Sequence, residues 1–373
     1  MSVLLTSVLD EAEKKGGCRF FFLYIFVHLC VTENMMIRLY RYALAAGTML
    51  AAGVFFSTAL HAQETHVDEI SVDARATFHQ QTENGIYDSH FQGDYFNIHM
   101  MGHLTDNISF RIRQRMNKKI DEQNPFNATD FLWINWQTRS NWSFTLGKQP
   151  ILVGGYEFDS PPIEVYYYSA FLSHLYQYYA FGATVHYTYA PDQQIAFQFS
   201  PSPVSSGLQD AYSYNVYWSG RPLEHWKTLW SFNIVEDQFH RKMNYIALGN
   251  KFPLGGLVLD LDLMNRASFK QQKFFFSDWT VIFKAIWTVG KWNLCTKFGY
   301  ERNDASNVDE NGLSFDTALP AGNDYLYGGC GVEYFPLGND NLRLHAVYFR
   351  DNHDNINNYD IGMTWRFNIY KRP

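Results

Sequence analysis

The sequence predicts an all-β fold, a transmembrane up-and-down antiparallel β-barrel of about 16 strands. Three observations predict it: segments in which apolar and polar residues alternate, short and long connections that follow one another in turn, and many aromatic residues beside few charged ones. Of the 373 residues, 18% are aromatic and only 18% are charged, whereas soluble domains carry about 25% charged residues. So many rings exclude disorder, and a net charge of −7 without a Lys/Arg run argues against nucleic acid as a partner.

Alternation with period two, which marks a strand with two different faces, recurs from residue 69 to the end of the chain. Ile108, Phe110 and Ile112, for example, alternate with polar and basic residues. Helical periodicity is almost absent, and the weakest strand patterns are those at 129–138, 211–219 and 226–235. The expected strands cover 69–80, 91–104, 107–116, 129–138, 142–149, 179–189, 193–200, 211–219, 226–235, 242–252, 256–265, 278–289, 291–301, 325–335, 341–350 and 358–369.

The connections between these strands are alternately short and long. Tight turns are expected at 105–106, 139–141, 191–192, 253–255 and 290. Longer polar connections cover 117–128, 150–178, 201–210, 266–277 and 302–324. This order is typical of an up-and-down barrel with turns on one rim and loops on the other.

A lipid-facing wall around a wet lumen explains these strands better than the core of a soluble β-sandwich. Rings such as Trp142, Tyr187 and Trp287 fall at strand ends, where the aromatic girdles of a membrane barrel lie. Other faces carry charges such as Asp260 and Lys284, which a sandwich core would not tolerate and a water-filled lumen would solvate. Closure of the barrel also satisfies the strand edges, which lipid cannot do.

The segment before the barrel is interpreted as a targeting signal. Arg38 and Arg41 precede an apolar stretch over 43–60, and Ala62 offers a small residue before a cleavage site. A retained membrane anchor is the alternative. The expected division is an upstream extension over 1–35, a signal peptide for Sec-type export over 36–62, and the outer-membrane β-barrel over 63–373.

Three neighbouring stretches carry a pattern of their own. They read Thr129-Asp130-Phe131-Leu132-Trp133-Ile134-Asn135-Trp136, Trp142-Ser143-Phe144-Thr145-Leu146-Gly147-Lys148-Gln149-Pro150 and Gly154-Gly155-Tyr156-Glu157. Together they resemble the phosphate-selective porin O and P family, whose members place a strand, a Gly, a basic or Gln residue, a Pro and a Gly-x-Glu at this point. The closing strand, Tyr359 to Phe367, is similar to the C-terminal strand that outer-membrane assembly machinery recognises, although this chain continues to Pro373. The resemblance implies an outer-membrane barrel of about 16 strands, typically a homotrimer, with a loop folded into the pore.

The connection over 150–178 is the expected constriction loop. Pro161-Pro162 and the run Tyr166-Tyr167-Tyr168 make it too apolar to extend freely into water. We therefore expect it to fold inward and narrow the lumen, with an extracellular flap as the alternative. Its acidic residues are Glu157, Asp159 and Glu164.

The candidate pore-lining cations are four arginines. Arg111, Arg113 and Arg115 are spaced by two, so they share one face of a strand, and Arg75 falls on the lumen face of the first strand. Guanidinium groups hold phosphate and carboxylate well, which favours anions; ordinary luminal ion pairs are the alternative. The family's phosphate specificity depends on a lysine cluster at the constriction, and 150–178 contains no Lys.

The sequence therefore predicts an outer-membrane porin for passive diffusion of small hydrophilic solutes, with a preference for anions such as phosphate as a weaker hypothesis. The expected partners are membrane lipid and lipopolysaccharide, the solutes, and further copies of the chain in a homotrimer. No cofactor or metal is expected. The rival hypotheses are a non-conducting barrel that serves in binding or assembly and, less favoured, a barrel hydrolase. The Gly-x-Ser-x-Gly and His-Glu-x-x-His motifs are absent from the sequence, so no catalytic residue is assigned.

Overall fold

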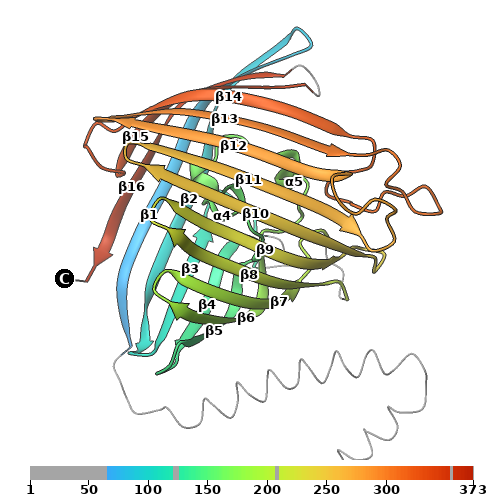
Figure 1. The fold of residues 1–373 in the computed structure, drawn as a ribbon. Helices are drawn as coiled ribbons and strands as arrows, with labels where there is room; N and C mark the ends of the chain where they lie inside the picture. The colour runs from blue at the N-terminus through green and yellow to red at the C-terminus, as the bar shows by residue number, and fades with distance from the viewer. Residues whose placement is uncertain (1–64, 121–125, 206–209, 353–355, 373) are drawn as a thin grey trace, which may run out of the picture. The chain divides into compact units, whose positions relative to one another are not determined.

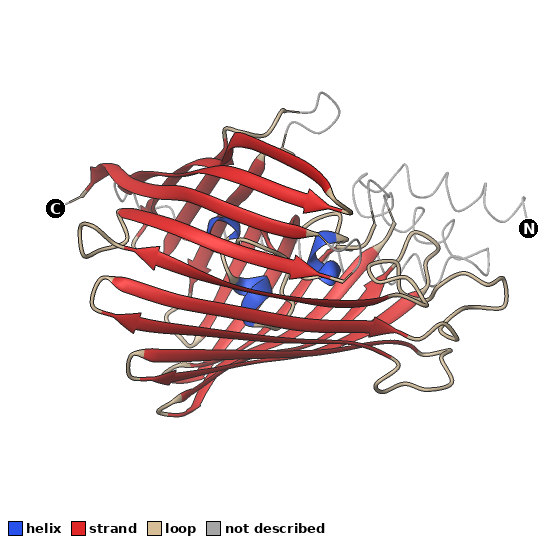
Figure 2. Ribbon diagram, turned by 90° about the horizontal axis from the view of Figure 1, so that it is seen from above, coloured by secondary structure: helices blue, strands red, loops and turns tan. Residues whose placement is uncertain are grey.

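The computed structural model describes residues 65–120, 126–205, 210–352 and 356–372. Each strand there is antiparallel to its neighbours and β1 pairs with β16, so the sheet closes into the expected barrel of 16 strands (Figures 1 and 2). The strands are β1 (His66–Glu83), β2 (Ile86–Thr105), β3 (Ile108–Arg115), β4 (Thr129–Gln137), β5 (Trp142–Pro150), β6 (Tyr179–Ala190), β7 (Gln193–Pro201), β8 (Tyr212–Leu223), β9 (Trp226–Glu236), β10 (Lys242–Leu254), β11 (Leu257–Ser268), β12 (Asp278–Val289), β13 (Trp292–Asn303), β14 (Asp324–Tyr334), β15 (Leu342–Asp351) and β16 (Asn357–Lys371).

The two rims of the barrel carry connections of different length. At the rim where β1 begins and β16 ends, which we call the turn rim, strands are joined by short turns such as residues 106–107 and 290–291. The opposite rim, the loop rim, carries the long connections, among them 116–128, 151–178 and 304–323. The alternation of turns and loops predicted from the sequence is therefore confirmed from β2 onward, whereas β1 and β2 are joined at the loop rim by the short turn 84–85.

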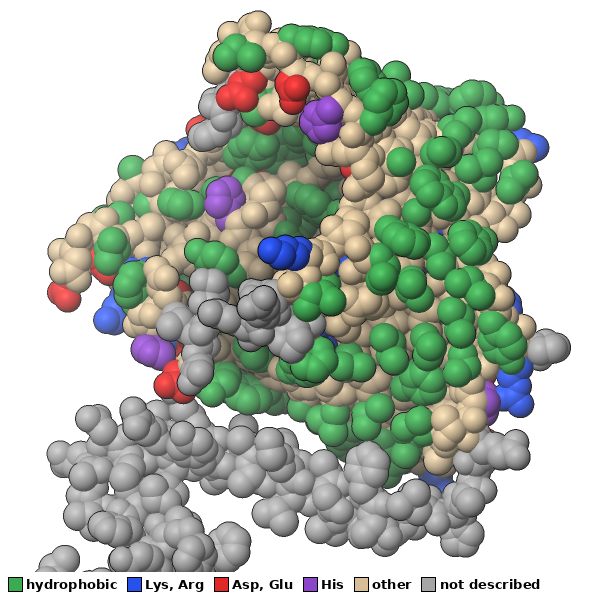
Figure 3. All heavy atoms as spheres, turned by 180° about the vertical axis from the view of Figure 1, so that it is seen from behind, with side chains coloured by type: hydrophobic (Ala, Val, Ile, Leu, Met, Phe, Trp, Pro, Cys, Tyr) green, Lys and Arg blue, Asp and Glu red, His purple; other side chains and the backbone are tan. Residues whose placement is uncertain are grey.

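The strand register separates an apolar outer face from a polar inner face. Asp260 on β11 lies opposite Lys251 on β10 and Lys284 on β12, and these side chains face the lumen. Their neighbours along the strands face outward, and Figure 3 shows apolar side chains spread over the outer wall. The exposed apolar residues of the strands include Phe181, Ile195, Phe197, Val216, Phe232, Leu263, Phe283, Leu294, Phe298, Leu326, Leu344, Ile361 and Met363. A wall of this kind suits contact with lipid chains.

The first hairpin is longer than the sequence pattern predicts. The expected strands ended at residue 80 and resumed at 91, but β1 continues to Glu83 and β2 begins at Ile86. Asn84 and Gly85 form the turn, with φ of 47° and 84°, which suits the type I′ turn that Asn-Gly favours. The hairpin extends past the neighbouring strands at the loop rim (Figure 1). There the apolar alternation fades, since a strand outside lipid does not need a continuous apolar face.

The long connection over 151–178, which we call the inner loop, folds into the barrel as expected. It contains α4 (Tyr156–Asp159), η1 (Pro162–Glu164) and α5 (Ala170–Ser173). Figure 2 shows these helices within the ring of strands. The extracellular flap, the alternative drawn from the sequence, is therefore wrong.

The expected extension over 1–35 and the signal peptide over 36–62 lie outside the described residues. Among the residues that the structure does describe, no helix is long and apolar enough to cross a membrane.

Candidate permeation pathway

The inner loop begins with a close approach to the barrel wall. A Cβ at Gly154 would lie 2.6 Å from the carbonyl oxygen of Leu229, and Gly155 has a φ of 113°, which L side chains rarely adopt. The backbone N–H of Gly154 donates to Ser231 Oγ at 2.7 Å. These two glycines belong to the Gly-Gly-Tyr-Glu stretch of the sequence, and the contact explains why glycine is needed there.

Two carboxylates of the inner loop pair with cations on the far wall. Glu157, in α4, accepts a hydrogen bond from Lys297 of β13. Glu164, in η1, lies 2.6 Å from Nη1 of Arg343 on β15 and also pairs with Arg366 on β16. The Arg343 side chain is only 7% exposed, so this contact neutralises a charge that water cannot fully solvate.

The tyrosine run fastens the middle of the loop to the wall at β14–β15 and at β2. The Tyr166 hydroxyl donates to Glu333 Oε1 at 2.8 Å, and the Tyr167 ring stacks on Phe349 with centroids 4.1 Å apart. The hydroxyls of Tyr168 and Tyr95, on β2, lie 3.1 Å apart. The aromatic run predicted from the sequence to fold inward therefore contacts the wall on both sides of the β1–β16 pairing.

The second part of the loop is held by an apolar cluster. The Glu301 carboxylate, on β13, accepts hydrogen bonds from the backbone N–H groups of Ala170 and Phe171 at the start of α5. The Phe171 ring then meets Tyr245 of β10 edge to face at 5.6 Å. The cluster joins α5 to the wall and to the 304–323 connection, and its buried members are Phe171, Leu172, Leu175, Val204, Val235, Met243, Tyr245, Phe315 and Ala318. One side of the lumen is thus filled by packed protein.

The β3 arginines point into the lumen, although two of them are paired. Nε of Arg113 donates to Asp130 Oδ2 at 3.1 Å, and Arg115 lies 3.9 Å from the same carboxylate. Arg111 stacks on Phe131, its guanidinium carbon 4.5 Å from the ring centroid. Within the described residues it has no carboxylate partner, and its Nε has no hydrogen-bond acceptor. Arg111 therefore remains the most available positive charge of this row.

Arg75 connects β1 to both the wall and the inner loop. Its Nε donates to Asp94 Oδ2 at 2.9 Å, and its Nη1 donates to the carbonyl oxygens of Ile163 and Val165 at 3.2 and 3.1 Å. The side chain is buried. Its geometry is that of a group that holds the loop in place, and its role in conduction stays a prediction.

Asp159, the third loop carboxylate, is exposed to the lumen. The surrounding wall and loop still raise the pKa of its carboxyl above the ordinary value through desolvation, which the nearby positive charge of Lys251 opposes. It lines the same cavity as Arg111 and Arg113. Asp159 therefore faces the same cavity as the basic residues of β3, whereas Glu157 and Glu164 pair with cations of β13, β15 and β16.

Three cavities follow one another along the lumen. A loop-side cavity of about 410 Å³ shares Tyr168, Tyr178 and Tyr179 with a central cavity of about 270 Å³. The central cavity shares Glu157 and Ser160 with a turn-side cavity of about 290 Å³. Shared lining residues place the central cavity between the other two, so a solute would pass them in this order.

The charges along these cavities change sign from the loop rim to the turn rim. The loop-side and central cavities are lined by the basic residues Arg111, Arg113, Arg115, Lys118 and Lys148 and the acidic residues Asp130, Glu157 and Asp159. The turn-side cavity is lined by the acidic residues Glu157, Glu164, Asp260, Asp262, Glu333 and Asp340 and the basic residues Lys284, Lys297, Arg343 and Arg366. The pathway is therefore more basic toward the loop rim and more acidic toward the turn rim.

Sequence reasoning missed the residues that hold the loop. Lys297, Arg343 and Arg366 lie on β13, β15 and β16, more than 130 positions from the loop carboxylates that they meet. Their inward direction follows from strand alternation, but no local pattern indicates which loop they contact. Only the closed topology, which brings β13–β16 across from the loop, reveals the pairing.

The comparisons with known proteins begin with the matched family. Residues 82–224 match the model of the family called phosphate-selective porin O and P. The matched stretch contains β3 with its arginines and the whole inner loop. The resemblance drawn from the sequence is confirmed over these residues. No curated protein matches the sequence.

The barrel is similar to solved porin structures at low sequence identity. The trimer form of OmpT, an outer membrane protein of Vibrio cholerae, is 12% identical, covers 82% of this chain and 100% of its own, and gives a TM-score of 0.56. OmpF of Salmonella typhi, in complex with daunomycin, is 11% identical over 80% and 98% of the two chains, with a TM-score of 0.56. The anion-selective porin from Comamonas acidovorans is 8% identical over 82% and 100%, with a TM-score of 0.52. These similarities establish a shared fold.

Proposed function

We propose that this chain is an outer-membrane porin through which small hydrophilic solutes diffuse passively. The observation that carries the proposal is a closed, lipid-facing barrel whose polar lumen holds three successive cavities around an inward-folded loop. The family match over residues 82–224 supports a channel rather than an enzyme. No energy source is needed, because a wet lumen lets solutes move down their own gradients.

We further propose a weak preference for anions, set near the loop rim. Arg111 lacks a carboxylate partner among the described residues and lines the central cavity. Arg113 and Arg115 share Asp130, and the turn-side cavity carries many carboxylates. Because the two ends of the pathway oppose each other in charge, strong selectivity for phosphate is not expected.

A homotrimer in contact with membrane lipid and lipopolysaccharide is the proposed assembly, after Sec-type export directed by residues 36–62. The apolar outer wall offers surface for both kinds of contact. The trimer form of Vibrio cholerae OmpT supports a trimer for a barrel of this fold.

Conductance through planar bilayers tests the proposed function. The purified, folded protein should give stepwise, ohmic current increments. In a salt gradient it should give a small reversal potential, with the sign expected when anions permeate more readily than cations. Heat-unfolded protein is the matched control and should give no steps. Folded protein that inserts but never conducts would contradict the porin and favour the binding or assembly barrel.

A further inference from the structure

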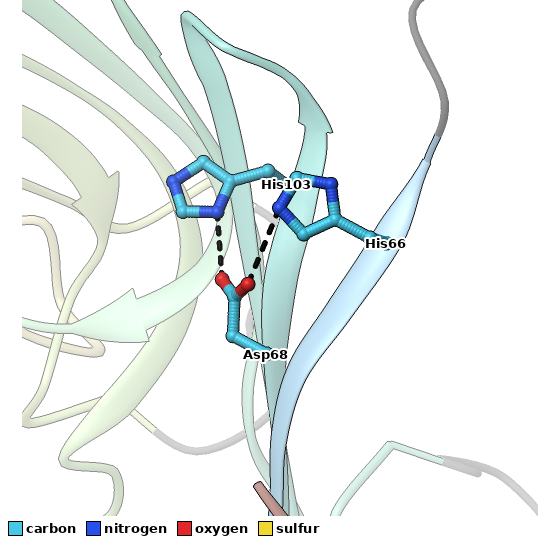
Figure 4. A group of neighbouring side chains, drawn as sticks. All are labelled: His66, Asp68 and His103. Atoms are coloured by element: carbon cyan, nitrogen blue, oxygen red, sulfur yellow. Dashed lines mark hydrogen bonds and ion pairs between the residues drawn. The ribbon is translucent and has the colours of Figure 1, made fainter. Parts of the chain in front are cut away.

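Two histidines and an aspartate meet at the turn rim, where β1 begins beside the end of β2. His66 and His103 are directly opposite each other in the strand register, and their rings stack with centroids 5.4 Å apart. Asp68 lies between them: Oδ1 is 3.2 Å from His66 Nε2, and Oδ2 is 2.7 Å from His103 Nδ1. Figure 4 shows both rings turned toward the one carboxylate.

A β-bulge explains why the aspartate reaches both rings. The register between β1 and β2 shifts between Val67 and Glu69, so Asp68 is the extra residue of the bulge. Bulges redirect side chains and are common near the rims of barrels. The backbone N–H of Arg372 also donates to the carbonyl oxygen of Asp68 at 2.7 Å, which ties the bulge to the end of β16. The carboxylate is thus set by backbone geometry.

The geometry points to a binding site for a divalent transition-metal ion, which we propose is held by His66, Asp68 and His103. One ligand atom from each of the three residues lies within 4.8 Å of the others. Imidazole nitrogen and carboxylate oxygen are the donors that Zn²⁺, Ni²⁺ and Cu²⁺ accept together. With metal–ligand bonds of about 2 Å, neighbouring ligands of a tetrahedral ion lie about 3.3 Å apart, so small ring movements suffice to form the site.

The site is open rather than enclosed. The side chains are 32%, 33% and 41% exposed for His66, Asp68 and His103. Three protein ligands leave at least one position of the ion for water, the arrangement typical of exchangeable sites rather than of structural ones. The ion would therefore bind reversibly at the mouth of the barrel, and the fold, which is closed by strand pairing, would not depend on it.

Metal titration of the purified, folded protein tests the site. Zn²⁺ is titrated against a chromophoric chelator, and Co²⁺ is added separately because its visible absorption reports ligand geometry. We expect saturable binding of one ion per chain and Co²⁺ bands of a four- or five-coordinate site. Loss of a residue that only supports a metal ligand weakens metal binding about 10- to 100-fold. His103→Ala and His66→Ala each remove a proposed ligand, so each should weaken Zn²⁺ binding by at least this factor. Asp68→Asn should weaken Zn²⁺ binding too.

His90→Ala is the matched control. His90 also lies near a carboxylate, with Nδ1 3.4 Å from Asp88, and its ring lies 5.5 Å from that of His79. It sits on the opposite rim, however, and among the described residues it belongs to no group of three close ligand atoms, so this variant should bind like the unchanged protein. Folding of each variant is checked by the heat-dependent gel mobility of the barrel. If a histidine variant does not fold, Asp68→Asn, which keeps the size of the side chain, still tests whether these residues bind the metal ion. No saturable binding, or binding that His103→Ala and Asp68→Asn leave unchanged, would overturn the proposal.

Discussion

Luminal cations on two neighbouring parts of the barrel wall have different partners. On β13–β16, Lys297, Arg343 and Arg366 pair with carboxylates of the inner loop. On β1 and β3, Arg75 and Arg113 pair with aspartates of the adjacent strands. The first group therefore holds the loop through the carboxylates of the loop. Arg113 belongs to the wall whatever the loop does, whereas Arg75 also contacts the loop through the backbone carbonyls of Ile163 and Val165. Luminal arginine and lysine side chains therefore have different roles, depending on whether a carboxylate of the loop lies within reach.

The loop itself is anchored in two physically different ways. Its first half depends on charged contacts such as Glu164 with Arg343, and its second half depends on the apolar cluster around Phe171. Salt screens charged contacts that water can reach, but it does not weaken apolar packing. The two anchors can therefore be separated by experiment.

Phe171→Ala should have the largest effect. Removing this ring from the apolar cluster is expected to cost about 3–5 kcal/mol, because a cavity replaces buried contacts. The measurement is the unfolding temperature of the barrel in detergent, followed by circular dichroism at low and at high salt. The decrease in unfolding temperature should be the same at both salt concentrations. Phe239→Ala, at an exposed ring of the loop rim, is the control, and an equal loss there would refute the anchor.

Glu164→Gln should loosen the other half of the loop. Loss of its charge-assisted contacts with Arg343 and Arg366 is expected to cost about 2–3 kcal/mol, which raises the population of a displaced loop about 30- to 140-fold. Single-channel recordings should show larger or noisier current steps, and high salt should make the unchanged protein behave more like the variant. Glu310→Gln, at an exposed loop carboxylate, is the control. Steps of unchanged size and noise would mean that Glu164 does not hold the loop.

The contrast between these two groups of cations also shows how much of the structure can be predicted from the sequence. Strand alternation predicts which face Arg111, Asp260 and Lys284 take, because the period of a strand is local. The apolar inner loop is predicted to fold inward for the same kind of reason, since its tyrosines avoid water. The pairing of Glu164 with Arg343 joins residues 179 positions apart, and closure of the barrel alone brings them together. The bulge at Asp68 breaks the alternation that strand prediction depends on.

Arg111→Ala should change selectivity more than stability. The arginine has no carboxylate partner among the described residues, so its removal takes one positive charge from the central cavity. A single charge acts on a nearby ion in water with about 1 kcal/mol, so the anion-to-cation permeability ratio should fall by about fivefold at most. The reversal potential in a salt gradient measures it. Arg221→Ala, at the turn rim, is the control, and an unchanged potential in Arg111→Ala would show that the row of arginines does not steer anions.

Asp159 should make the selectivity depend on pH. Desolvation raises the pKa of its carboxyl above the ordinary value, against the pull of Lys251, so this group takes up its proton at a higher pH than a free carboxyl does. Acid therefore removes the negative charge from the cavity that Arg111 lines at a higher pH than it would for a free carboxyl, and the reversal potential should shift further toward anions as the pH falls. Asp159→Asn should already show the shifted potential at neutral pH and respond less to acid. Glu157 lines the same cavity but is held by Lys297. If Asp159→Asn responded to acid as strongly as the unchanged protein, another group would be responsible for the pH dependence, and the prediction for Asp159 would be wrong.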